Sequence, residues 1–257
     1  VKHEFPRVRL IANGRNRGFA AANNQALIQS QGQYLLLLNP DTELRPRALP
    51  LLIGFLESHP RVGLVGPQLL YPDGSFQHGA FRFPTLAMSF LDLFPLHHRL
   101  LDSNLNGRYP RTAYDGFPFE IDHPLGACLA LPRPAMEQVG LLDEGFFYYC
   151  EEIDWALRLR QAGWRVFCVP QARVVHHGAQ STSQVAGPAF VQLQRSRLLL
   201  FKKHYSPGFI WAHRLILRAG MAWARLDTAW AYRRRRLSLQ QYQERRGTFA
   251  QVLRLLV

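Results

Sequence analysis

The strongest constraint on the fold is an unbroken apolar segment, Tyr34–Leu38, that ends in the polar tripeptide Asn39-Pro40-Asp41. This is the length of a strand, and a continuous apolar run is typical of a strand covered on both faces. Similar runs at 62–70 and 125–131 are separated by segments of helical composition. Strands that alternate with helices predict an α/β protein in which a sheet is flanked by helices.

The same periodicities predict the other elements. We expect further strands at 7–12, 165–169 and 172–175, and helices at 19–29, 48–58, 133–139, 153–162, 190–204 and 209–235. Residues 76–120 are rich in Phe, Pro and His and lack a steady period. They predict a long loop with short helical pieces, which we interpret as a lid or an acceptor-facing insert.

The basic charge is concentrated towards the C-terminus. Residues 1–185 contain 17 Lys and Arg against 16 Asp and Glu, a net charge of +1, whereas residues 186–257 contain 14 against 2, a net charge of +12. This asymmetry favours an anionic partner, either a membrane or a nucleic acid, for the C-terminal segment alone. The three cysteines form no metal-binding spacing, which argues against a zinc site or a disulfide framework and fits a reducing cytoplasm.

The acid at the end of the first apolar strand is a candidate metal ligand. A strand that ends in Asn39-x-Asp41 presents oxygen atoms to a hard cation such as Mg²⁺ or Mn²⁺, which could neutralise a leaving nucleoside diphosphate. The alternative is structural, because Asn-Pro-Asp is also good turn chemistry. His176 follows a short strand and could complete the coordination, although a pair such as His176-His177 is otherwise an ordinary surface feature.

A second acidic cluster, Glu151-Glu152-Ile153-Asp154, follows an aromatic run at 146–149. A carboxylate near a cation and an apolar wall can act as a general base towards an acceptor hydroxyl. The structural alternative is that acids at the start of a helix complement its dipole, and both can hold at once. Arg158 lies four residues after Asp154, which is the spacing of a helical ion pair.

Two glycine-containing segments allow a ligand to approach the backbone. Asn16 and Gly18 precede a helix whose free N–H groups favour anions, with an ordinary capped turn as the alternative. Gly126 and Ala127 leave space beside a strand, either for a sugar or for tight core packing.

Taken in order, these motifs resemble those of the inverting family-2 glycosyltransferases with a GT-A fold, especially the rhamnosyltransferase-like branch. The resemblance spans roughly residues 7–205. Its matching segments are 16–24, 37–42, 126–127, 139–147, 151–154 with Arg158, and 176–181.

The resemblance implies a role for each motif. Asp41 stands in the second acidic position of the family's DxD-type motif, with Asn39 in the first, and His176 stands for the metal-binding histidine. Glu152 aligns with the catalytic base, with Glu151 and Asp154 as neighbouring candidates. The family usually has Glu-Asp where this chain has Glu-Glu, so the base would sit one methylene further out. Asn16, Gly18 and Arg158 would contact the donor, and Gly126 and Ala127 the acceptor.

The activity that the resemblance implies is metal-dependent transfer of a sugar from a nucleotide-sugar donor, dTDP-rhamnose or a UDP-sugar, to a hydroxyl of a cell-surface glycan or lipid-linked acceptor. Residues 1–185 would form the catalytic domain. Residues 186–257 would form a basic helical region that rests on the anionic inner face of the plasma membrane, or packs on the core as a helical subdomain. A nucleic-acid partner is not expected, since no binding motif is present.

The family normally opens with a strand, a helix and a second strand that contact the nucleotide base, about 50 residues in all. This chain begins after those elements, with Val rather than Met. A misassigned start or a truncated fragment would explain the difference, and either predicts an exposed apolar sheet edge. An inactive fragment that only binds a partner or a membrane is therefore the alternative to an active transferase.

Overall fold

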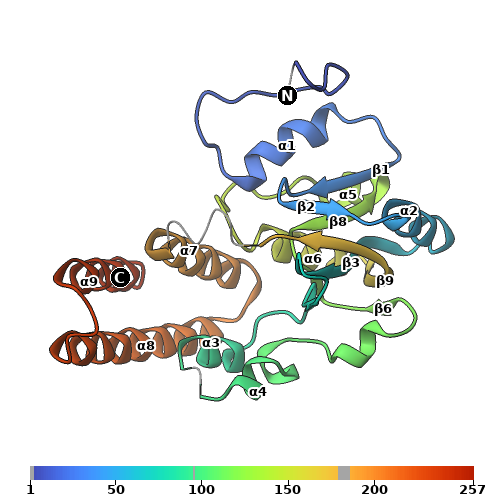
Figure 1. Ribbon diagram of the computed structural model, residues 1–257. Coiled ribbons are helices and arrows are strands. Elements are labelled where there is room, and N and C mark those ends of the chain that lie inside the picture. The colour runs from blue at the N-terminus through green and yellow to red at the C-terminus, as the bar shows by residue number, and fades with distance from the viewer. Residues whose placement is uncertain (1–2, 95, 179–185) are drawn as a thin grey trace.

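The structure, a computed structural model, describes residues 3–94, 96–178 and 186–257. Figure 1 shows a mixed sheet flanked by helices, with further helices from the C-terminal part of the chain on one side. The elements in chain order are α1 (Phe19–Gln29), β1 (Tyr34–Leu38), β2 (Thr42–Leu44), α2 (Ala48–Ser58), β3 (Val62–Leu70), β4 (Phe76–Gln77), β5 (Ala80–Phe81), α3 (Leu86–Leu93), α4 (His98–Leu101), η1 (Asn104–Asn106), η2 (Arg111–Tyr114), β6 (Phe119–Glu120), β7 (His123–Pro124), β8 (Cys128–Pro132), α5 (Arg133–Val139), α6 (Glu151–Gln161), β9 (Arg165–His176), α7 (Ala186–His204), α8 (Pro207–Arg233) and α9 (Leu239–Arg254).

The main sheet has the strand order β1-β8-β3-β9-β2, with β4 added to β3 and β6 added to β9. Strands β3 and β9 are parallel, whereas β8 runs antiparallel to both β1 and β3. The sheet is therefore mixed, which confirms the predicted α/β class. Strand β1 pairs with β8 alone in the described structure, so its other edge is open.

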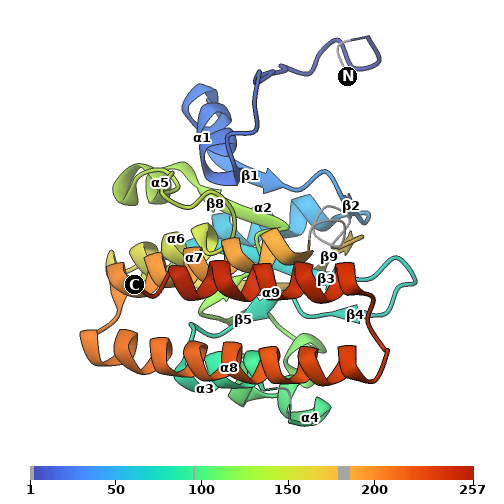
Figure 2. The same ribbon diagram turned by 90° about the vertical axis from the view of Figure 1, so that its left-hand side faces the viewer.

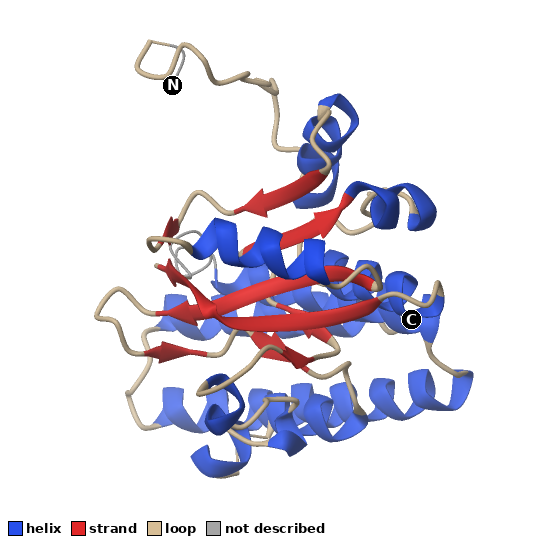
Figure 3. Cartoon of the chain, turned by 90° about the vertical axis from the view of Figure 1, so that its right-hand side faces the viewer, coloured by secondary structure: helices blue, strands red, loops and turns tan. Residues whose placement is uncertain are grey.

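Helices cover both faces of this sheet. Side chains alternate between the two faces along each strand, so an apolar strand presents apolar side chains to the helices on both sides. Leu129 and Leu131 of β8 pack with α1, α5 and α6 on one face. Ala130, between them, packs with α2 on the other face. Figure 3 shows the sheet in red between these helical layers. Two apolar clusters thus hold the strands in place and fix the positions at which β1 and β9 end.

The C-terminal helices form a separate layer beside the sheet domain. Helices α7, α8 and α9 share an apolar cluster that includes Leu198, Leu217 and Val252. Helix α3 contacts α8, and the aromatic Phe201 of α7 joins this layer to the start of α6. Figure 2 shows α8 and α9 side by side, with α3 next to α8. None of the described helices is long and apolar enough to cross a bilayer.

Most predicted elements are confirmed, and the exceptions have physical causes. The strand expected at 7–12 is wrong: this segment is exposed and pairs with no strand. The strands expected at 165–169 and 172–175 are one strand, β9, because pairing with β3 carries it through residues 170 and 171 across an irregularity in register. Helix α9 was not predicted, although Ser238 and Gln241 form a capping box at its start.

Candidate active site

The segment that leads into α1 is held against the loop before α6. The Gly18 N–H donates to Asn16 Oδ1 (2.9 Å), and the Phe19 N–H donates to the Phe147 carbonyl oxygen (2.8 Å). Gly18 has φ of 82°, and a Cβ at this position would collide with that oxygen. Glycine is required here for both conformation and space. The sequence-predicted pair Asn16 and Gly18 is thereby fixed beside residues 147–149.

The end of β1 brings Asp41 next to His176. Thr42 pairs with His176 across β2 and β9, and the His177 N–H donates to the Asp41 carbonyl oxygen (2.9 Å). As a result, Asp41 Oδ2 lies 3.6 Å from His176 Nε2, which is too far for a hydrogen bond. The Asn39 N–H donates to the Ala127 carbonyl oxygen (2.9 Å). Strand pairing and the adjoining backbone hydrogen bonds therefore bring together four of the predicted positions: Asn39, Asp41, Ala127 and His176.

The state of His176 suits a metal ligand. Burial lowers its pKa, against the opposing charge of Asp41, so the imidazole is neutral at pH 7. Its Nδ1 lies 3.2 Å from Gln77 Oε1. Since that oxygen accepts, Nδ1 carries the proton and Nε2 keeps its lone pair on the side of Asp41.

One carboxylate and one neutral imidazole fit a divalent cation whose other ligands come from substrate phosphates. Within the described ranges, no group of three or more His, Cys, Asp and Glu side chains gathers as a metal site.

A cavity of about 670 Å³ opens beside Asp41 and is called here the Asp41 cavity. Its lining includes Asn16, Gly18, Asn39, Asp41, Tyr149 and Gln192. These residues come from the approach to α1, the end of β1, the loop before α6, and α7. Four of the predicted positions, Asn16, Gly18, Asn39 and Asp41, thus face one space, and Asp41 is also one of the two expected metal ligands.

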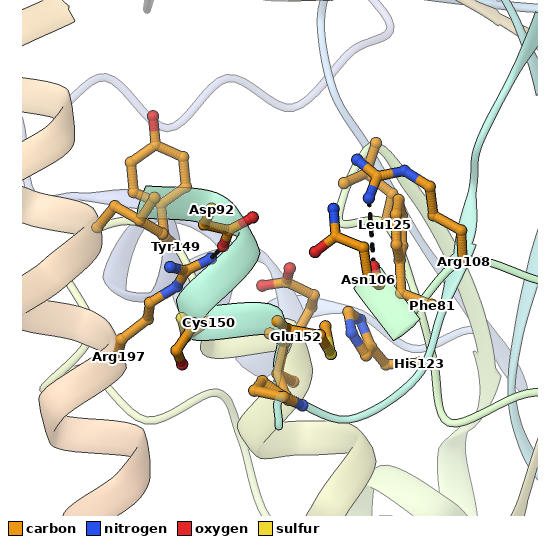
Figure 4. Close-up of a pocket in the computed structure, with 15 residues that line it drawn as sticks. Phe81, Asp92, Asn106, Arg108, His123, Leu125, Tyr149, Cys150, Glu152 and Arg197 are labelled. Atoms are coloured by element: carbon orange, nitrogen blue, oxygen red, sulfur yellow. Dashed lines mark hydrogen bonds and ion pairs between the residues drawn. The ribbon is translucent and has the colours of Figure 1, made fainter. Parts of the chain in front are cut away.

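A second cavity of about 210 Å³ contains Glu152 and is called the Glu152 cavity. In Figure 4, Glu152 lies in the middle, with Tyr149 and Arg197 on one side and Asn106 and Arg108 on the other. Tyr149 lines both cavities. The two cavities are therefore neighbours, with Tyr149 in the wall of each.

Two carboxyl groups begin α6, of which Glu151 is buried and Glu152 is partly buried. Glu151 is only 4% exposed, and its Oε2 has no hydrogen-bond partner among the described residues. Burial, reinforced by the charge of Glu152, raises the pKa of Glu151 to about 9. Burial raises the pKa of Glu152 to about 7, against backbone hydrogen bonds that favour its ionised form. At neutral pH, Glu151 is therefore protonated, whereas the protonated and ionised forms of Glu152 are both populated.

Gly126 lies directly beside Glu152, since a Cβ added to it would be 3.8 Å from the carboxyl carbon of Glu152. Ala127 follows and is buried in the core. The space expected at this glycine therefore adjoins the candidate base, while Ala127 contributes its backbone carbonyl to Asn39.

Comparisons with known proteins assign this chain to a family. The model of "Glycosyl transferase family 2" matches residues 1–114. An N-acetylglucosaminyl-diphospho-decaprenol L-rhamnosyltransferase of Mycobacterium tuberculosis is 30% identical over 234 residues, which cover 85% of this chain and 74% of that protein. The chain belongs to glycosyltransferase family 2. The rhamnosyltransferase WbbL of Escherichia coli is 26% identical over 182 residues, which cover 67% of this chain and 66% of WbbL.

A solved family-like structure supports the same fold. The mannosyltransferase PcManGT from Pyrobaculum calidifontis, in complex with GDP-Man and Mn²⁺, matches with a TM-score of 0.50 at 14% identity. The match covers 96% of this chain and 68% of that one. The fold of this family-2 chain is therefore GT-A, as the motif order predicted.

Six of the predicted site residues lie outside the linings of both cavities: Gly126, Ala127, Glu151, Asp154, Arg158 and His176. Arg158 donates to Asp154 Oδ2 (2.8 Å), to the Val139 carbonyl oxygen (2.6 Å) and to the Leu141 carbonyl oxygen (2.9 Å). This placement does not fit the predicted donor contact for Arg158. The guanidinium instead ties α6 to the end of α5, in line with the helical pairing that the spacing also predicted.

Asp154 is fully buried and serves the packing of α6 on α7. Its carboxylate accepts from Arg158, Lys203 and His204. Burial opposes its ionisation, but these hydrogen bonds and the Arg158 charge lower its pKa overall. A carboxylate with a lowered pKa and three hydrogen-bond partners is a poor proton acceptor, which leaves Glu152 as the candidate base.

Residues that sequence reasoning missed complete the site. Tyr149 and Cys150 adopt left-handed backbone conformations, with φ of 72° and 69°. Ser196 of α7 holds this turn by donating to the Tyr148 carbonyl oxygen (2.7 Å). Such strain persists only where surrounding contacts fix it. The aromatic run was visible in the sequence, but its placement between two cavities depends on α7. Arg108 and Arg197 gave no local signal at all.

Proposed function

We propose that this chain transfers a sugar from a nucleoside-diphosphate donor in the Asp41 cavity to a hydroxyl of a glycan or lipid-linked acceptor in the Glu152 cavity. The observation that carries the proposal is that Tyr149 lines both cavities, with the candidate metal ligand Asp41 in one and the carboxyl group of Glu152 in the other. This layout supports a single displacement between two bound substrates.

In this mechanism, Glu152 accepts the proton of the acceptor hydroxyl, and the hydroxyl oxygen forms a bond to the anomeric carbon of the sugar. The bond from that carbon to the phosphate oxygen breaks, and its electron pair leaves with the nucleoside diphosphate. One displacement inverts the anomeric configuration. Asp41 and His176 would hold a divalent cation, which supplies charge neutralisation for the diphosphate when it is bound. Tyr149 would orient the two substrates.

The relatives guide the choice of substrates to test. Two of them are rhamnosyltransferases, and one of these acts on N-acetylglucosaminyl-diphospho-decaprenol by its name. We therefore propose a rhamnosyl donor, with dTDP-rhamnose tested before UDP-sugars, and a sugar linked to a lipid diphosphate as acceptor. Such an acceptor places the enzyme at the inner face of the plasma membrane, in peripheral contact with anionic lipid through its C-terminal helices.

The test is a transfer assay that follows nucleoside-diphosphate release and product formation with Mn²⁺ or Mg²⁺ over a panel of donors. Glu152→Gln should retain donor binding and lose turnover by about 10²- to 10⁴-fold, because a positioned base contributes that much. Glu57→Gln is the matched control, since Glu57 is exposed on α2. Transfer by the wild-type chain would rule out the inactive fragment. Wild-type turnover in Glu152→Gln would remove Glu152 from its role.

A further inference from the structure

The outer face of α8 is apolar although its large side chains are exposed in the described structure. Trp211, Leu215, Trp223, Leu226 and Trp230 are between 42% and 68% exposed. With 3.6 residues in each helical turn, these five positions fall within about 120° of the helix circumference. Ala219 and Ala222 are exposed on the same arc. A continuous apolar face of this length on a surface helix indicates an interaction site.

The opposite face of α8 already supplies the packing that the fold needs. His213, Leu217, Gly220 and Met221 are buried. Gly220 lies against Leu93 of α3, and His213 Nδ1 lies 3.1 Å from Ser89 Oγ of the same helix. Figure 2 shows α8 with α9 along one side and α3 along another. The exposed tryptophans are therefore not part of the core that holds the helices together.

Arginines border this apolar face. Arg218 and Arg225 are exposed along one flank, and Arg233–Arg236 end the helix. The guanidinium of Arg234 lies 4.2 Å from the centre of the Trp230 ring, and that of Arg236 lies 5.3 Å from it. Tryptophan and arginine together are characteristic of the headgroup region of a bilayer, where an indole sits at the apolar boundary and a cation sits at the phosphates.

This charge pattern favours a lipid surface over a second copy of the chain as the partner of the outer face of α8. In a twofold dimer the same face meets itself, so the positively charged helical regions of both copies would be brought together. Residues 186–257 carry a net charge of +12, and self-pairing of such a face is opposed by charge repulsion. An anionic bilayer offers both an apolar interior for the tryptophans and phosphates for the arginines.

We propose that the outer face of α8 is a membrane-docking surface that inserts Trp211, Trp223, Leu226 and Trp230 into the boundary of an anionic bilayer. This inference rests on the proposed function, in which a lipid-linked acceptor has to be reached at the membrane. The helix that packs on α8, α3, also lines the Glu152 cavity through Met88, Ser89 and Asp92. Docking by α8 therefore places the acceptor side of the site close to the lipid surface.

The experiment measures binding of the full chain to vesicles of phosphatidylcholine, with and without phosphatidylglycerol, in the absence of donor and acceptor. Quenching of tryptophan fluorescence by brominated lipid reports insertion. Three of the five tryptophans lie on the outer face of α8, whereas Trp155 is fully buried and Trp164 lies against the sheet domain. Anionic vesicles that contain brominated lipid should quench the tryptophan fluorescence, and neutral vesicles with the same brominated lipid should quench it much less.

Leu226→Glu places a negative charge in the centre of the face and keeps every tryptophan. It should weaken binding to anionic vesicles by about 10-fold or more, because the burial of one leucine side chain is lost. Ile28→Glu on α1 is the matched control, since Ile28 and Leu226 are both 68% exposed, and it should bind as wild type. Replacing Arg234 and Arg236 by Gln should cost about fivefold for each charge.

Docking and catalysis are measured separately, so either can fail alone. If docking is correct, Leu226→Glu should still transfer sugar to a short water-dispersed acceptor, while losing transfer to an acceptor embedded in vesicles. Absence of lipid quenching in the wild type, or equal quenching in Leu226→Glu, would overturn the docking surface. So would a dimer in sedimentation that Leu226→Glu dissociates, or salt-sensitive binding to DNA without binding to vesicles.

Discussion

Asp41 and His176 face each other with Oδ2 and Nε2 3.6 Å apart, although they are far apart in the sequence. The pairing of β2 with β9 produces this proximity, since Thr42 is directly opposite His176. Two candidate ligands beside paired strands are held at a fixed separation, and such rigidity is what a cation site needs before any substrate arrives.

Removing the carboxylate tests that pair directly. Asp41→Ala should weaken Mn²⁺-dependent donor binding by more than about 100-fold, because even partners of metal ligands are worth 10- to 100-fold. Titration calorimetry with and without Mn²⁺ measures the change. Glu43→Ala is the control: Glu43 is on the same strand but binds His177 (2.7 Å) and lines neither cavity. Equal losses in the two variants would refute the assignment of Asp41.

The pH dependence of turnover reports on Glu152. A general base works in its ionised form, so kcat should rise with pH and level off above about 7, where burial has placed the pKa of Glu152. The profile should be measured at saturating donor and acceptor between pH 5 and 9, a range about 2 units to either side of that pKa. A profile that is already level at pH 5 would show that a carboxylate with an ordinary pKa is the base.

Glu151 should make folding stability depend on pH. Its pKa is about 9 in the folded protein and is raised from 4.5. The folded state therefore binds more protons than the unfolded state between these values, and the stability that burial of the neutral acid allows is lost as pH rises.

Glu151→Gln mimics the protonated acid, so it should be more stable than wild type at pH 9 by at least about 1 kcal/mol and similar to it at pH 5. Urea denaturation at the two pH values measures the difference. An identical pH slope in both proteins would contradict the buried, protonated state. Turnover of Glu151→Gln near pH 7 should stay within a few-fold of wild type, since Gln replaces a group that is neutral there.

Gly18→Ala tests the contact that closes the Asp41 cavity. The added methyl group meets Phe147 at a position where φ is also 82°. The free energy of unfolding should fall by about 1–3 kcal/mol, and donor affinity should fall with it, because the loop at 147–149 has to move. At Gly14, a Cβ meets no atom within 4 Å. Gly14→Ala should therefore leave stability and donor affinity unchanged. If Gly14→Ala lost as much of both as Gly18→Ala, the contact between Gly18 and Phe147 would not be the cause.

Asp154→Ala should lower the free energy of unfolding. This loss of stability says nothing about which residue is the catalytic base. It leaves Arg158, Lys203 and His204 without their shared carboxylate, and breaking a buried ion pair costs about 3–5 kcal/mol. Asp143→Ala removes the other, more exposed partner of Lys203 and should cost about 1 kcal/mol or less. Chemical denaturation compares the two. If Asp154→Ala were as stable as Asp143→Ala, the proposal that Asp154 holds α6 against α7 through Lys203 and His204 would be refuted.

The sequence by itself determined the local elements around the site. Helices α1 and α2 and strands β1 and β3 begin and end at the residues that their patterns predict, because a helix or a strand face is encoded by neighbours a few positions apart. The acidic and glycine motifs were also visible, since each is contiguous. The strand predicted at 7–12 is wrong because a strand needs a partner, and a strand-like pattern alone does not supply one.

Only the tertiary structure decided which of these residues meet. Glu152 and Asp154 belong to one acidic motif and one helix, yet Glu152 lines a cavity and Asp154 is buried under α7. Likewise, nothing in the sequence around Trp223 says whether it packs inward or outward; the contact of Gly220 with α3 decides that. Burial, and with it the pKa of a carboxyl or the exposure of an indole, is set by groups far away in the chain, which local patterns do not encode.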